Sequence, residues 1–219
     1  MSQSSIDKPL RAFFEPKTLS ELGLSGQIIT PAVRYEATDI AKEGIQAILS
    51  RLPKMNKKPM PMDIDMACVL LDQSGSELER VYYGNIRTDD NSVRHGGDAL
   101  TGATSFEDKF INQEQIDLHL DKLDKKVHHI LIIIASHHRH CLTRAAKGLG
   151  ILRDNDGVLA HEFELASLDK NTHAIIAWHL KKDDNDWLVH VPLHPIKHSE
   201  MPKLLNSAAE FMSADSTRW

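Results

Sequence analysis

The chain has 219 residues, of which 41% are hydrophobic, so it can bury a substantial core in one domain or in two small ones. Its formal net charge of -5 and its isoelectric point near 6.2 argue against a protein that wraps nucleic acid by neutralising phosphates. No apolar run approaches the roughly 18 residues of a membrane span, and the first ten residues lack a signal-peptide pattern, so a cytoplasmic location is expected.

Residues 1–55 are expected to form a helical and irregular N-terminal extension. Residues 1–35 mix prolines with short apolar groups, whereas residues 37–52 carry apolar side chains at helical spacing after Thr38 or Asp39 as the N-cap. An amphipathic helix is therefore predicted over 37–52. Residues 52–62 combine prolines with lysines, which is typical of a linker, and a domain boundary is predicted near residue 55.

Residues 56–200 show the pattern of a β domain, in which short strands alternate with turns rich in Gly, Asp and Asn. Eight strands with little helix between them predict a mainly β fold, an antiparallel β-sandwich. Residues 201–219 form a C-terminal tail, with a short helix expected over 203–211. The predicted strands are 62–71, 76–85, 116–120, 127–136, 149–153, 159–165, 174–180 and 186–193.

Two carboxylates stand at the start of the first predicted strand. Alternate residues of a strand share a face, so Asp63 and Asp65 point the same way, and Ala67, Val69 and Leu71 continue that face into a core. Two carboxylates side by side raise each other's pKa and repel. Since the predicted strand 62–71 contains no Lys or Arg, the pattern favours a hard divalent cation with oxygen ligands.

A segment of nearly thirty residues, 88–115, lacks strong periodicity, and loops of that length inside a compact domain are usually functional or disordered. Its glycines allow tight backbone paths, and its many oxygen-bearing side chains are of the kind that calcium binds. The alternative interpretation is a solvated connection between strands.

Five sequence blocks occur in an order that resembles the TerD-type tellurium-resistance and stress-response domain. The likeness covers residues 60–136 and fades downstream, and residues 1–55 either supply that family's opening strands in altered form or form a separate helical attachment for a partner. The blocks are DIDMACVLLDQSG, VYYGN, DDNSVRHGGDALTG, EQIDLHLDKL and HHILIIIAS.

The resemblance implies a β-sandwich that binds calcium and has no catalytic activity. It implies metal ligands at Asp63, Asp65, Asp98 and Glu114, and protein partners in a stress-response complex that could lie at the membrane periphery without a span. Of the family's acidic triplet before the Gln-Ile step, only Glu114 keeps a charge here. Either inserted acids such as Glu107 and Asp108 replace the missing ligands, or the site has lost a calcium.

A histidine-rich segment, SHHRHC, supports a different class of function. His137, His138, His140 and Cys141 could hold a soft or borderline metal such as zinc, in a binding protein or a metal-dependent enzyme. Because adjacent residues of a strand face opposite ways, at most His138 and His140, or one of these with a distant residue, could share a metal without a turn of the chain. The alternative is a basic surface loop.

An aspartate-nucleophile phosphatase, which also carries an Asp-x-Asp pair at a strand end, is disfavoured because PMPM, rather than an apolar strand, precedes Asp63.

Overall fold

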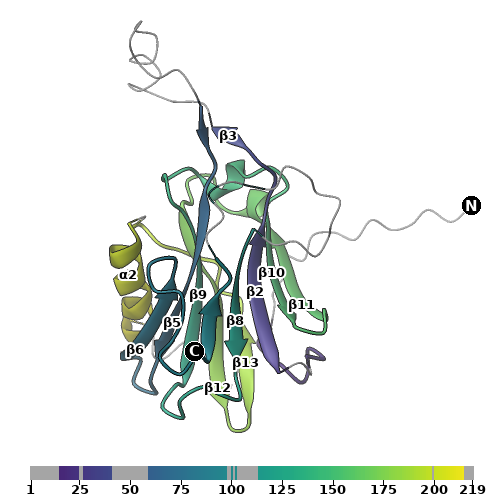
Figure 1. Ribbon diagram of the computed structural model, residues 1–219, viewed down its shortest axis with the longest axis vertical. Helices are drawn as coiled ribbons and strands as arrows, with labels where there is room; N and C mark the ends of the chain where they lie inside the picture. Colours follow the sequence, from purple (N-terminus) through teal and green to yellow (C-terminus); the bar gives the residue numbers. More distant parts are fainter. Residues whose placement is uncertain are drawn as a thin grey trace, which may run out of the picture.

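The computed structural model describes residues 15–24, 27–40, 59–97, 100, 102, 113–198 and 200–214. Within these residues the chain folds into two antiparallel sheets of seven and five strands that pack face to face (Figure 1). The first sheet has the order β1 (Lys17–Thr18), β13 (Asp186–His190), β12 (Ala174–Asp183), β9 (His129–Ser136), β5 (Ile64–Leu71) and β6 (Glu77–Tyr82), with β14 (His194–Pro195) also paired to β12. The second has the order β11 (Leu159–Glu164), β10 (Leu149–Asp154), β2 (Ile28–Arg34), β8 (Glu114–His119) and β7 (Val93–His95).

The main core lies between the two sheets. On β5 the alternation is strict, so that Met66, Cys68 and Leu70 face the second sheet. A register shift in β12 between Ile176 and Trp178 turns the Trp178 indole into the same core, where it is fully buried. Apolar residues of both sheets thus close on one another, as expected for a β-sandwich.

A helix covers the outer face of the first sheet. Helix α2 (Met201–Ala214) lies against the side of the sheet that holds β5 and β6 (Figure 1). Leu204 and Leu205 of the helix pack on Ala67, Val69 and Leu71 of β5 in a second core cluster. The predicted C-terminal helix is therefore confirmed, over a longer range than 203–211, and the face shared by Asp63 and Asp65 does continue into a core.

The prediction of a helix over residues 37–52 is wrong for residues 37–40, the part of that range that the structure describes. Asp39 and Ile40 form a short strand, β3 (Asp39–Ile40), paired with β4 (Met60–Pro61), at the upper end of the molecule in Figure 1. The Thr38 hydroxyl does not cap a helix, because it donates to the Glu36 carbonyl at 2.8 Å and accepts the Ala146 N–H at 3.1 Å. Residues 41–52, the rest of the predicted helix, lie outside the described residues.

Strand β2 comes from the stretch that the sequence assigns to the N-terminal extension. It lies between β10 and β8 in the second sheet, so residues 28–34 supply a strand of the sandwich. Pro31 pairs with Leu152 of β10, while the pairing with β8 skips residues 30 and 31. Proline has no N–H donor, and because no β8 residue pairs with Pro31, the strand pairing does not require one there.

Among the described residues, no helix is long and apolar enough to cross a membrane.

Candidate metal centre

Three buried acidic side chains lie around the first residues of β5, close enough for the charges of Glu114 and Asp63 to act on Asp65. Asp63 and Asp65 come from the start of that strand, and Glu114 is the first residue of β8 in the other sheet. Strand β6 pairs with β5 only from Ala67 onward, so the preceding N–H groups lie beyond the edge of that pairing. Glu114 uses this gap, since its Oε2 accepts the Met66 N–H at 2.7 Å.

The three carboxylates are buried almost completely. Asp63, Asp65 and Glu114 are 5%, 3% and 2% exposed. Burial raises the pKa of Asp65 to about 7, and the charges of Glu114 and Asp63 add to the increase, although a hydrogen bond from His137 lowers it. The cluster therefore carries more negative charge than its surroundings stabilise well at neutral pH, which is the condition that a bound cation relieves.

Histidines partner each of these acids. The His137 Nδ1 lies 3.0 Å from Asp65 Oδ2, the His138 Nε2 lies 4.0 Å from Asp63 Oδ2, and the His95 Nε2 lies 3.4 Å from Glu114 Oε2. The side chains of His95 and Glu114 are fully buried, whereas those of His137 and His138 are 43% and 35% exposed. Imidazole nitrogens thus lie beside the three acids that the sequence predicts as oxygen ligands of calcium.

Tyr35 closes the cluster from the side of β2. Its hydroxyl accepts the Ile64 N–H at 3.2 Å, between the two aspartates in sequence. Burial raises the pKa of Tyr35 above its usual range, and the charges of Asp63, Glu114 and Asp65 raise it further. The hydroxyl therefore stays protonated beside the acids.

The fourth predicted ligand, Asp98, lies outside the described residues, as do Glu107, Asp108 and Asn112. Two described residues of the same loop can be placed. His95 at the end of β7 contacts Glu114, and Gly102 packs against the backbone of Glu36, where an added Cβ would come within 2.5 Å of the carbonyl group. Only a glycine fits that contact without displacing backbone.

The histidine-rich segment does not follow the strand geometry expected for it. Strand β9 ends at Ser136 and the chain turns, with Arg139 at φ +60°, so the adjacent His137 and His138 both reach the acid pair. His140 and Cys141 lie further along the turn, where the His140 N–H donates to Ser136 Oγ. The expected pairing of His138 with His140 assumed a continuous strand, and that geometry does not apply because the strand ends before them.

The two metal hypotheses from the sequence thus concern one place in the fold. Within the described ranges, no three His, Cys, Asp or Glu side chains are already arranged to hold a metal ion together. Space is available beside the cluster, because a cavity of about 280 Å³ borders Asp65. It is lined by Asp65, Tyr83, His137, Arg139, Glu200, Met201 and Pro202.

Comparisons with known proteins agree with this architecture. The family model for the TerD domain matches residues 35–192. The tellurium resistance protein TerZ of Serratia marcescens is 22% identical over 126 residues, which cover 58% of this chain and 62% of that protein. The chain thus spans less than two thirds of the length of this curated relative.

Two crystal structures share the fold. A protein of unknown function, SAV2460, matches with a TM-score of 0.62 and 13% identity, over 82% of this chain and 95% of the other. A homologue of the telluride resistance protein (TerD), SCO6318 from Streptomyces coelicolor A3(2), matches with a TM-score of 0.61 and 8% identity, over 82% and 96%. At these identities the structural matches establish the fold alone.

Proposed function

Because the family model covers residues 35–192, the chain belongs to the TerD domain family, and we propose that it is a non-enzymatic, calcium-binding stress-response protein. The observation that carries the proposal is the buried cluster of Asp63, Asp65 and Glu114, in which burial, together with the neighbouring charges, raises the pKa of Asp65 to about 7. Calcium takes oxygen ligands and would neutralise this charge. The two cysteines are both free thiols, which fits the proposed cytoplasmic location.

The donor set fits calcium in chemistry, although the carboxylates are not yet arranged around a common point. Binding requires Asp65 to turn from His137 and Asp63 to turn from His138, contacts of 3.0 and 4.0 Å that involve partly exposed imidazoles. Glu114 would join β8 to the start of β5 through the ion. We propose that this link orders the loop between β7 and β8 and completes a surface for protein partners of a stress-response complex. The relative TerZ is named a tellurium resistance protein, which supports a stress-response role.

A calcium titration tests the proposal. Calcium at a hundred times its Kd is expected to stabilise the protein by about 2.7 kcal/mol, which raises the melting temperature by roughly 5–10 °C for a domain of this size. Asp63→Asn and Glu114→Gln should each abolish the gain, and Asp98→Asn tests whether the loop supplies a further ligand. The matched control is Asp121→Asn, because Asp121 is an exposed carboxylate next to β8. Equal gains in the control and in Asp63→Asn would contradict a calcium site at the cluster.

Zinc is the second candidate, because His137 and His138 bring imidazole nitrogens to the same aspartates. A mixed set of nitrogen and oxygen ligands suits zinc better than calcium. The same titration with zinc separates the two. If zinc binds, His137→Ala and His138→Ala should each weaken it strongly, whereas they should leave calcium binding largely intact.

A further inference from the structure

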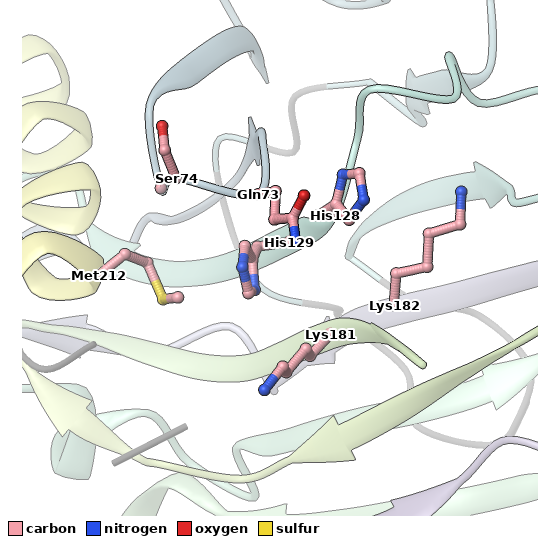
Figure 2. A pocket seen from close by; sticks show the side chains of 8 residues that line it. Gln73, Ser74, His128, His129, Lys181, Lys182 and Met212 are labelled. Atoms are coloured by element: carbon pink, nitrogen blue, oxygen red, sulfur yellow. The ribbon is translucent and has the colours of Figure 1, made fainter. Parts of the chain in front are cut away.

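Another cavity, of about 280 Å³, lies at the end of β5 that is remote from the acidic cluster, and its polar groups do not gather around one point (Figure 2). Lys181 and Lys182 are consecutive residues of β12, so their side chains leave opposite faces of the sheet, and Figure 2 shows their ammonium groups pointing apart. The His129 Nδ1 is held 3.0 Å from His179 Nε2. Buried polar groups converge instead at the other end of β5, around Glu114.

His95 and Glu114 come from paired strands of the second sheet and share one face. Strand β7 pairs with β8 so that His95 lies opposite Ile116, and Glu114 is two residues away along β8. Residues two apart on a strand point to the same face. Both side chains are fully buried, and the His95 Nε2 lies 3.4 Å from Glu114 Oε2. The strand pairing therefore places the imidazole against the carboxylate, away from solvent.

The backbone of Gly97 determines which nitrogen of His95 carries the proton. The Gly97 N–H donates to His95 Nδ1 at 3.2 Å, so Nδ1 must present its lone pair. The imidazole is then neutral, and its proton lies on Nε2, the nitrogen that faces Glu114. Gly97 has φ +118°, a backbone conformation that favours glycine, and in this conformation its N–H points at the ring.

Two N–H groups are directed at the same oxygen of Glu114. Oε2 accepts the Met66 N–H at 2.7 Å, and the Nε2–H of His95 faces it at 3.4 Å. The second separation is longer than an ordinary hydrogen bond, but in a buried environment it still gives electrostatic attraction. A carboxylate oxygen has two lone pairs, so these two groups leave no lone pair of Oε2 for a cation. The oxygen of Glu114 that remains for a cation is Oε1.

We propose that His95 is a positioning residue of the metal centre, which holds Glu114 so that the cation binds to Oε1 alone. This inference rests on the proposed calcium site. His95 does not itself bind the ion, because its lone pair accepts the Gly97 N–H and its proton faces the carboxylate. Of the three imidazoles beside the acids, it is therefore the one that supplies no metal ligand. Groups that hold a ligand in this way typically contribute about 10- to 100-fold to metal affinity.

Calcium titration calorimetry at constant pH and ionic strength tests the role of His95. His95→Leu should weaken calcium binding by about 10- to 100-fold. His95→Gln should keep most of the wild-type affinity, because the amide at the end of its side chain supplies an N–H in place of Nε2–H. The matched control is His161→Leu, since His161 is also buried but lies on β11, at the opposite edge of the same sheet from β7.

Gly97→Ala gives a second test that leaves the buried pair intact. An added Cβ meets no atom within 4 Å, so this substitution acts through the backbone conformation at φ +118°. It should weaken calcium binding, as His95→Leu does, while the circular dichroism spectrum stays native. NMR of the imidazole nitrogens in the metal-free wild type should place the His95 proton on Nε2.

The outcomes distinguish the role of His95 from calcium binding itself. If wild type does not bind calcium, both proposals are wrong. If wild type binds calcium and His95→Leu binds it as tightly as His161→Leu does, the calcium site stands and the role of His95 is overturned. A proton on Nδ1, or equal calcium affinities of Gly97→Ala and wild type, would overturn that role as well. If His95→Leu does not fold, these last two measurements decide.

Discussion

Replacing Asp65 by asparagine is expected to stabilise the metal-free protein at pH 8 by roughly 2–4 kcal/mol, since each unit of the raised pKa corresponds to about 1.4 kcal/mol. The pKa of Asp65 in the folded protein is about 7, above the ordinary value of 3.8 that it has in the unfolded chain. Between these two values the folded state holds a proton that the unfolded state has released, so the free energy of unfolding falls as pH rises. This loss of unfolding free energy is complete above pH 7 and absent below pH 4. The Asp65→Asn variant avoids the loss, because asparagine does not titrate.

Urea unfolding at pH 4.5 and at pH 8 measures this effect. The difference between Asp65→Asn and wild type should be near zero at the lower pH and largest at the higher one. Histidines with lowered pKa values, such as His161 and His190, are shared by both proteins and cancel in the comparison. Asp121→Asn should show no such pH dependence. A variant that is less stable than wild type at pH 8 would mean that His137 already compensates the charge of Asp65.

Calcium should reverse the order of stability. With saturating calcium at pH 8, wild type should gain stability while Asp65→Asn gains little, because the variant has lost a charged ligand. This opposition separates a cation site from a buried ionic network that serves only the fold. In such a network, removing one carboxylate would leave His137 without its partner and would destabilise the protein under both conditions.

Trp178→Ala is expected to lower the free energy of unfolding by about 3–5 kcal/mol. The indole is fully buried between the sheets, its Nε1 donates to His161 Nδ1 at 3.2 Å, and its ring meets Phe163 edge to face with centroids 5.5 Å apart. Alanine would leave a large cavity and an unsatisfied histidine. Urea unfolding followed by far-UV circular dichroism measures the loss without relying on the fluorescence of the deleted residue.

An exposed residue of the same region is the control. Leu159 lies on β11 and is 53% exposed, so Leu159→Ala should change stability by no more than about 0.5 kcal/mol. A loss below 1 kcal/mol for Trp178→Ala would contradict the packing described between the two sheets.

Much of the sandwich could be predicted from alternation and turn residues. The predicted strands correspond to β5, β6, β8, β9, β10, β11, β12 and β13. Strand β2 could not be found this way, because Pro31 in its middle is typical of an irregular segment, and only the register against β8 shows how it is tolerated. Strand β7 has three residues, too few for a pattern to emerge.

The candidate site was predicted in part. The sequence placed Asp63 and Asp65 on one face, and Glu114 joins them in the structure. It gave no sign that His137 and His138 would contact the same aspartates, because that depends on a turn after β9 that the His137 N–H stabilises by donating to the Asp63 carbonyl at 3.0 Å. His95 is likewise brought to Glu114 by the pairing of β7 with β8, which no local pattern reports.

A crystal structure grown with calcium tests the central claim most directly. It should show one ion between Asp63, Asp65 and Glu114, with carboxylate oxygens at about 2.3–2.6 Å from it, and with His137 and His138 turned away. A structure at saturating calcium in which Asp65 still binds His137, Asp63 still faces His138, and no ion lies among the three acids would contradict it.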